Sequence, residues 1–119
     1  MSTYRNCKNE FPDFDYALPS IEGFTDSSWH NDVCPSLSKE IAEGIFVQIF
    51  CDYRKKSLRE YKDYYKYFVG VTNSDEQIFE TNSLRELRQW VKNCLFIQEH
   101  IANINKINEV NTPHNKMPN

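Results

Sequence analysis

Glycine is scarce in this chain of 119 residues, which has three: Gly23, Gly44 and Gly70. They are too widely spaced to form a phosphate-binding loop or the glycine fingerprint of a dinucleotide-binding turn. The sequence also lacks the Gly-x-Ser-x-Gly elbow of serine hydrolases. These absences argue against the common enzyme classes, so we expect a protein without catalytic activity and without a cofactor.

Long apolar runs are also missing. No stretch approaches the roughly 18 apolar residues of a membrane-spanning helix, and the N-terminal sequence lacks the apolar segment of a secretory signal. The four cysteines match no disulfide-rich pattern of secreted proteins. We therefore expect a cytoplasmic protein with reduced thiols and no membrane association.

Metal-ligand spacings do not occur either. A metal site would have to combine residues such as Cys7, His30, Cys34 and Cys51. No Cys-x-x-Cys or His-x-x-x-His pair is present, and such short spacings are what make zinc motifs recognisable. The sequence therefore predicts no metal site.

Charge is present in both signs but is unevenly distributed. The net charge is −3, and residues 1–43 carry eight acids and three bases, whereas residues 54–66 carry six bases and two acids. A net negative charge argues against a protein that binds duplex DNA through bulk charge. The uneven distribution leaves two interpretations: the molecule presents an acidic and a basic face, or it pairs its own opposite charges.

Apolar residues change their period along the chain, which predicts the fold class. They alternate over residues 45–53, 64–72 and 77–81, as in strands, and then recur every three to four residues over 84–103, as on one side of a helix. Ser83 and Glu86 match the capping box that begins a helix. We predict an α+β domain: a three- or four-stranded antiparallel meander packed by one long C-terminal amphipathic helix.

The core and the domain limits follow from the same pattern. The predicted core residues are Val47, Ile49, Cys51, Tyr67, Val69, Leu84, Leu87, Val91, Cys94 and Ile101. Residues 45–53 are partly apolar on both faces, which favours a central strand. We predict a single domain over residues 11–103, flanked by a flexible N-terminus at 1–10 and a flexible tail at 104–119.

The first 43 residues show no sustained period, and we interpret them as an irregular N-terminal arm. Aromatic residues are strung through this arm, which indicates that it packs over the core, because disordered segments lack them. Pro35 at one end and Gly44 at the other are typical of the limits of a helix, so residues 36–43 are expected to form two helical turns.

The densest group of reactive side chains follows Trp29 and includes His30, Asp32 and Cys34. A thiol nucleophile needs a base beside it and a third group that orients the base. The adjacent Pro35 and the lack of a glycine-rich oxyanion turn weigh against such chemistry. The alternative, which we favour, is a structural turn in which Trp29 packs in the core and Asp32 bonds to nearby backbone.

Basic and aromatic residues are interleaved over residues 54–66, which we name the basic loop. Its candidate binding residues are Arg54, Lys55, Lys56, Arg59, Tyr61 and Lys62. Single-stranded nucleic acid is held by cations along its phosphates and by aromatic rings that stack on its bases. A solvated hairpin tip without a binding role is the alternative interpretation.

The sequence as a whole favours a small accessory or inhibitor-like protein-interaction module that works in the cytoplasm without catalysis. Its partner would be a protein that contacts the acidic segment Glu10–Asp32 or the basic loop, or a second copy of the chain. Binding of single-stranded nucleic acid through the basic loop is the alternative function.

Overall fold

The computed structural model describes residues 6–72, 74 and 76–94. The chain divides into two compact units, Met1–Leu87 and Arg88–Asn119. The first unit holds an antiparallel sheet, and helical residues follow it, so the predicted α+β class is confirmed. Within the described part of the chain, no helix has both the length and the apolar character needed to cross a membrane. The predicted limits at residues 10 and 103 stay predictions.

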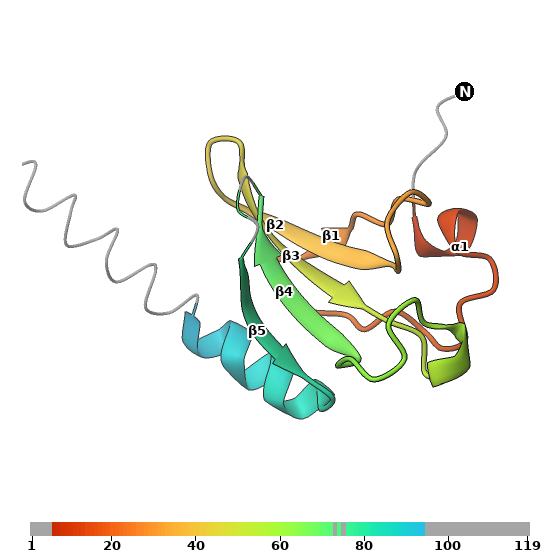
Figure 1. Cartoon of the computed structure of the whole chain (residues 1–119). Helices are drawn as coiled ribbons and strands as arrows, with labels where there is room; N and C mark the ends of the chain where they lie inside the picture. Colours follow the sequence, from red (N-terminus) through yellow and green to blue (C-terminus); the bar gives the residue numbers. More distant parts are fainter. Residues whose placement is uncertain (1–5, 73, 75, 95–119) are drawn as a thin grey trace, which may run out of the picture. The chain divides into compact units, whose positions relative to one another are not determined.

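The sheet is a simple meander in which each strand pairs with the next along the chain (Figure 1). Its strands are β1 (Thr25–Asp26), β2 (Ser36–Ala42), β3 (Ile45–Cys51), β4 (Tyr67–Val71) and β5 (Gln77–Thr81). The predicted number of three or four strands was therefore too low. Two short helical turns lie outside the sheet, α1 (Cys7–Glu10) and the 3-10 turn η1 (Lys56–Leu58).

Strand β2 corrects the expectation that residues 36–43 are helical. Its side chains alternate between the two faces of the sheet, and β2 joins β3 through a connection of two residues, Glu43 and Gly44. Gly44 has a φ of 75°. A glycine in this left-handed region ends helices but also forms the tight turns of hairpins. Gly44 was therefore correctly predicted to follow the end of an element, but that element is the strand β2 and not a helix.

The strands predicted nearest the middle of the sequence are confirmed. Strand β3 lies within the predicted segment 45–53, β4 lies within 64–72, and β5 coincides with 77–81. The predicted central place of β3 is also correct, since β2 and β4 flank it. Residues 54–63 lie in the connection between β3 and β4, which contains the 3-10 turn η1.

One face of the sheet carries the core. Leu37 of β2, Ile49 of β3 and Val69 of β4 lie in one cross-strand row, and all three side chains are buried. Burial of such side chains contributes about 1.5–3 kcal/mol each to stability. The predicted core residues that are buried are Val47, Ile49, Cys51, Tyr67, Val69, Leu87 and Val91. Leu84 and Cys94 are half-buried instead, and Ile101 lies outside the described residues.

The capping box at Ser83 forms in part. Helical residues run from 84 to 94, and Ser83 Oγ accepts the backbone N–H of Glu86 at 3.1 Å. The reciprocal bond from the Glu86 side chain to the Ser83 amide is replaced. Thr81 Oγ1 accepts the Ser83 N–H at 3.1 Å and itself donates to Glu86 Oε1 at 2.6 Å. The last residue of strand β5, Thr81, is thereby part of the cap of the helix. The predicted continuation of the helix to residue 103 lies outside the described residues.

Candidate interaction surface

Arg59 is a structural residue of the basic loop. It is 7% exposed, and its guanidinium donates to three backbone carbonyls. Nε reaches Tyr53 O at 2.6 Å, Nη1 reaches Tyr64 O at 3.2 Å, and Nη2 reaches Arg54 O at 3.3 Å. Buried polar groups must find such partners, because leaving them unpaired is costly. All three guanidinium nitrogens are engaged by backbone carbonyls of Tyr53 and of the loop, which gives Arg59 a structural role.

The other five candidate residues of the basic loop lie on its surface: Arg54, Lys55, Lys56, Tyr61 and Lys62. Tyr61 is 60% exposed. A hydrogen bond and the charge of neighbouring Glu60 raise the pKa of the Tyr61 hydroxyl. The guanidinium carbon of Arg54 lies 5.7 Å from the centre of the Tyr16 ring, within the range of a cation–π contact. The loop therefore presents cations and an exposed ring, with the exposed acids Glu60 and Asp63 among them.

The basic loop is attached to the N-terminal arm through Asp15. The Asp15 carboxylate accepts the backbone N–H of Arg54 and of Lys55, each at 2.8 Å. Burial raises the pKa of Asp15, but these hydrogen bonds outweigh it and hold the pKa below the ordinary value. Lys66 Nζ lies 4.2 Å from the centre of the Tyr16 ring. The arm and the loop are thus joined by backbone hydrogen bonds to Asp15 and by cations that lie over the Tyr16 ring.

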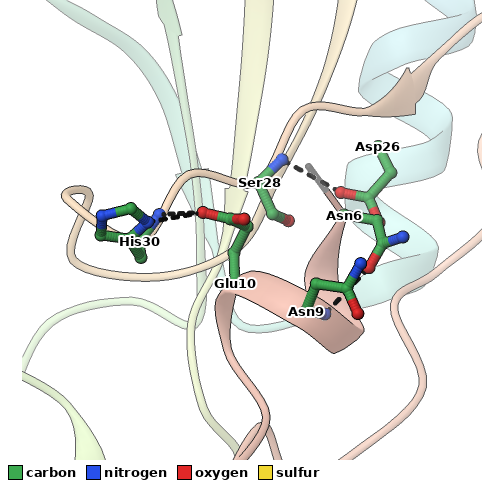
Figure 2. A network of polar contacts seen from close by, with 6 residues as sticks. All are labelled: Asn6, Asn9, Glu10, Asp26, Ser28 and His30. Carbon is green, nitrogen blue, oxygen red and sulfur yellow. Dashed lines mark hydrogen bonds and ion pairs between the residues drawn. The ribbon is translucent and has the colours of Figure 1, made fainter. Parts of the chain in front are cut away.

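Other acids of the arm also bond within the molecule. Asp26 Oδ1 accepts the Ser28 N–H at 3.0 Å, and Figure 2 shows this contact beside the pair of Glu10 and His30. Glu10 Oε1 lies 2.7 Å from His30 Nδ1 and also accepts the His30 N–H at 3.0 Å. Asp13 accepts the Tyr53 hydroxyl at 2.7 Å. These carboxylates supply the hydrogen bonds that an arm with little regular structure lacks in its own backbone.

The cluster at His30 and Cys34 forms no reactive thiol site among the described residues. Cys34 is completely buried, and burial raises its pKa far above the ordinary thiol value. His30 contacts Glu10 and the ring of Trp29, with the two ring centres 4.3 Å apart. Within the described part of the chain, no three side chains of metal-ligating type are grouped around a possible ion.

The second face of the sheet is aromatic and partly exposed. Phe46 and Phe50 of β3 and Phe68 of β4 alternate with buried core residues, and none of the three is fully buried. The rings of Phe50 and Phe68 are stacked at 5.1 Å and 14°, and the ring of Tyr64 meets Phe68 edge-on at 5.6 Å. We name these four residues the aromatic face. The second face of an antiparallel sheet is more often polar.

Acidic and polar residues flank the aromatic face. Glu40 lies directly opposite Phe46 on β2, and Glu80 lies opposite Phe68 on β5. Both glutamates are exposed. The apolar side chains on both faces of 45–53 were visible in the sequence, where they indicated a central strand. The aromatic face itself was missed, because apolar side chains on both faces of a strand do not reveal which face packs on the core.

Comparison with known proteins gives no family for this chain. No protein-family model, curated protein or solved structure matches it.

Proposed function

We propose that this protein is a small accessory or inhibitor-like interaction module without catalytic activity, and that the aromatic face is its docking surface. The observation that carries the proposal is the partly exposed ring stack of Phe50 and Phe68 on the face of the sheet opposite the core. Apolar patches that stay exposed on a soluble domain commonly mark interaction sites, and aromatic residues dominate the binding energy of interfaces.

The charges around this surface favour one kind of partner. Exposed Glu40 and Glu80 border the rings from the two neighbouring strands. A complementary surface would have an apolar centre and a rim of lysine or arginine, because matched charges steer association and suppress wrong partners. A second copy of this chain would bring acids toward acids. We therefore favour a different protein over self-association.

The cytoplasmic location remains part of the proposal. All four cysteines are free, and Cys34 and Cys51 are buried as small apolar side chains. Unpaired buried thiols are typical of proteins from a reducing compartment. Burial raises the pKa of both thiols, which supports a packing role for them in place of chemistry.

Two neighbouring substitutions on β3 test the aromatic face. Phe46→Thr changes the aromatic face, whereas Ile45→Thr is the matched control on the same strand, because adjacent side chains point to opposite faces. Ile45 is 37% exposed, and Phe46 is partly exposed. We expect a stoichiometric partner to be captured from cells by the wild type and by Ile45→Thr but not by Phe46→Thr.

Binding is then measured with the purified partner by calorimetry. We expect Phe46→Thr to weaken binding about ten-fold or more, as at an interface hot spot, while both variants unfold at similar temperatures. A concentration-dependent dimer that Phe46→Thr abolishes would assign the face to a second copy. A monomer that captures no stoichiometric partner would contradict the proposal.

Binding of single-stranded nucleic acid through the basic loop is the second candidate. The exposure of Tyr61 beside Lys62 favours it, since a free ring next to cations is the arrangement that holds such strands. With Arg59 engaged by backbone carbonyls, four of the candidate binding cations remain: Arg54, Lys55, Lys56 and Lys62. Contacts with about four phosphates would give a logarithmic salt slope near −3.

Titration of a labelled oligonucleotide at low salt tests this candidate. The double substitution of Lys55 and Lys56 by Ala should weaken binding for every sequence and make the slope shallower by about 1.4. Replacing exposed Arg85 by Ala is the control and should change neither. Absence of binding at roughly 10⁻⁴ M would leave the basic loop as a solvated connection.

A further inference from the structure

A pocket of about 490 Å³ lies beside α1, the arm and β1. Its volume falls within the range of small-ligand sites, about 300–1,000 Å³. None of its lining residues belongs to the aromatic face, so an inference from it goes beyond the proposed function. The lining residues that matter here are Lys8, Phe11, Phe14, Tyr16, Leu18 and Asp26.

The apolar wall of this pocket is held in place by packing. The ring of Phe14 contacts the rings of Tyr16 and Tyr53, with ring centres 4.4 and 5.3 Å apart. The Tyr16 hydroxyl donates to Asp52 O at 2.8 Å, which attaches the arm to the end of β3. Burial raises the pKa of this hydroxyl, so Tyr16 is neutral. A preformed apolar wall reduces the cost of ordering when a ligand binds.

The two charged residues of the pocket differ in their availability. Both carboxylate oxygens of Asp26 are engaged. Oδ2 accepts the Cys7 N–H at 2.7 Å, and Oδ1 accepts the Ser28 N–H at 3.0 Å (Figure 2). Lys8 is exposed and takes part in no ion pair among the described residues. Asp26 keeps its negative charge, but its oxygens are occupied, so Lys8 is the charged group of the pocket that is available to a ligand.

We infer that this pocket binds an apolar group, aromatic or branched aliphatic, that carries a single carboxylate. The apolar body packs against Phe11, Phe14 and Leu18, and the carboxylate meets the ammonium group of Lys8. Such a ligand matches a pocket in which apolar side chains stand beside one available charge, since small-ligand sites combine apolar side chains with a few placed polar groups. The same chemistry is found in a free aromatic acid and in the C-terminal residue of a polypeptide.

The test uses the full chain and two probes that differ in charge alone. These are 3-phenylpropionate and its neutral counterpart 3-phenylpropionamide, each titrated while amide shifts are recorded by NMR. We expect saturating shifts at residues 6–18 and 26, with millimolar affinity for so small a probe. The carboxylate should bind roughly two- to five-fold more tightly than the amide, the range of an exposed ion pair.

Two substitutions separate the charge from the wall. Lys8→Gln should reduce the affinity of the carboxylate to that of the amide and leave the amide unchanged, whereas Lys56→Gln is the control at an exposed lysine outside the pocket. Leu18→Ser should weaken the binding of both probes. If Leu18→Ser fails to fold, Lys8→Gln still decides, because Lys8 is an exposed residue.

The inference is overturned by any of three results. These are no saturating shift up to roughly 20 mM probe, equal binding of carboxylate and amide, or an unchanged preference in Lys8→Gln. A peptide that ends in phenylalanine, with a free or an amidated terminus, then distinguishes the source. Tighter binding of the free-acid peptide than of 3-phenylpropionate points to a protein C-terminus, and exclusion of the peptide points to a small acid.

Discussion

Arg59 Nε donates to the backbone carbonyl of Tyr53 at 2.6 Å and thereby joins the middle of the basic loop to the residue that precedes it. The same guanidinium reaches Tyr64 O near the end of the loop. One side chain therefore supplies hydrogen bonds that a segment between two strands does not find in a ladder. The planar fork of arginine is suited to this role, whereas lysine has a single nitrogen.

Replacing Arg59 tests this role. We expect Arg59→Ala to lower the free energy of unfolding by about 2–4 kcal/mol, because it leaves three carbonyls without their charged donor. Arg59→Lys should recover less than half of the loss. Urea unfolding followed by tryptophan fluorescence measures both. Lys56→Ala, at an exposed position of η1, is the control and should stay within about 0.5 kcal/mol of the wild type.

Asp15 gives the fold a pH dependence of definite sign. Burial alone would raise its pKa, but the N–H groups of Arg54 and Lys55 lower it below the ordinary value of 3.8. The unfolded chain therefore binds this proton more readily than the folded chain. Asp15 stabilises the fold above its unfolded pKa, and this contribution is lost as the pH falls through its folded pKa. Asp15→Asn should cost about 1 kcal/mol at pH 7 and flatten the acid limb of the stability curve.

Asp52 provides a control of opposite sign. Its pKa is raised, first by burial, although the Tyr53 N–H and the charge of Arg59 lower it in part. The folded chain here holds the proton more firmly, so stability falls as the pH rises from the unfolded pKa through the folded one. Asp52→Asn should therefore steepen the acid limb that Asp15→Asn flattens. Unfolding curves between pH 3 and pH 7 that show no such contrast would contradict both assignments.

The sequence predicted the elements that local patterns specify. The prediction was wrong where one local pattern fits two kinds of element and tertiary contacts decide between them. Strands β3, β4 and β5 and the Ser83 cap follow from periods and short motifs. Residues 36–42 show no strict alternation of apolar side chains, and Gly44 fits the end of a helix and the turn of a hairpin alike. Pairing with β3 decided between them.

The contacts that attach the arm to the basic loop could not be predicted from the sequence, for a different reason. Asp15 and the Arg54 amide are separated by 39 residues, and no spacing rule connects an acid to a backbone amide at that distance. The burial of Arg59 was missed because its neighbours in sequence are exposed, so the pattern marked it as one more surface cation.

The cysteines are expected to differ in reactivity according to their burial. Cys34 and Cys51 are fully buried, whereas Cys7 is half-buried, and its pKa is raised to about 11 by burial and by the charge of Asp26. Because the thiolate is the reactive form, iodoacetamide at pH 8 should label Cys7 slowly and leave Cys34 and Cys51 unlabelled in the folded protein. Peptide mass spectrometry measures this.

A matched variant separates the two causes at Cys7. Asp26→Asn removes the negative charge and should speed alkylation of Cys7 at pH 8, since the thiolate is no longer repelled. Labelling of Cys34 and Cys51 should stay absent in the variant until denaturant is added. Rapid labelling of Cys34 in the native protein would show that this thiol is accessible and would favour a role for Cys34 as a nucleophile.

The cap at Ser83 links the end of β5 to the beginning of the helix. Its removal should therefore lower the stability of the sheet as well as that of the helix. Ser83 Oγ accepts the Glu86 N–H, and Thr81 Oγ1 holds both the Ser83 amide and the Glu86 side chain. Loss of an N-cap hydroxyl costs about 1 kcal/mol. Thermal unfolding of Ser83→Ala should show a loss of that size, whereas Ser57→Ala, at an exposed residue of η1, should show almost none.

Glu86→Gln distinguishes the cap from a simple charge effect at the helix start. A glutamine at this position still accepts from the Thr81 hydroxyl but loses the favourable interaction of a negative charge with the first turn, which is worth about 0.3–1 kcal/mol. We therefore expect Glu86→Gln to be milder than Ser83→Ala and its effect to shrink with added salt, whereas the effect of Ser83→Ala should be independent of salt. Equal salt dependence in the two variants would mean that the contribution of Ser83 is electrostatic and does not come from its hydrogen bond to Glu86.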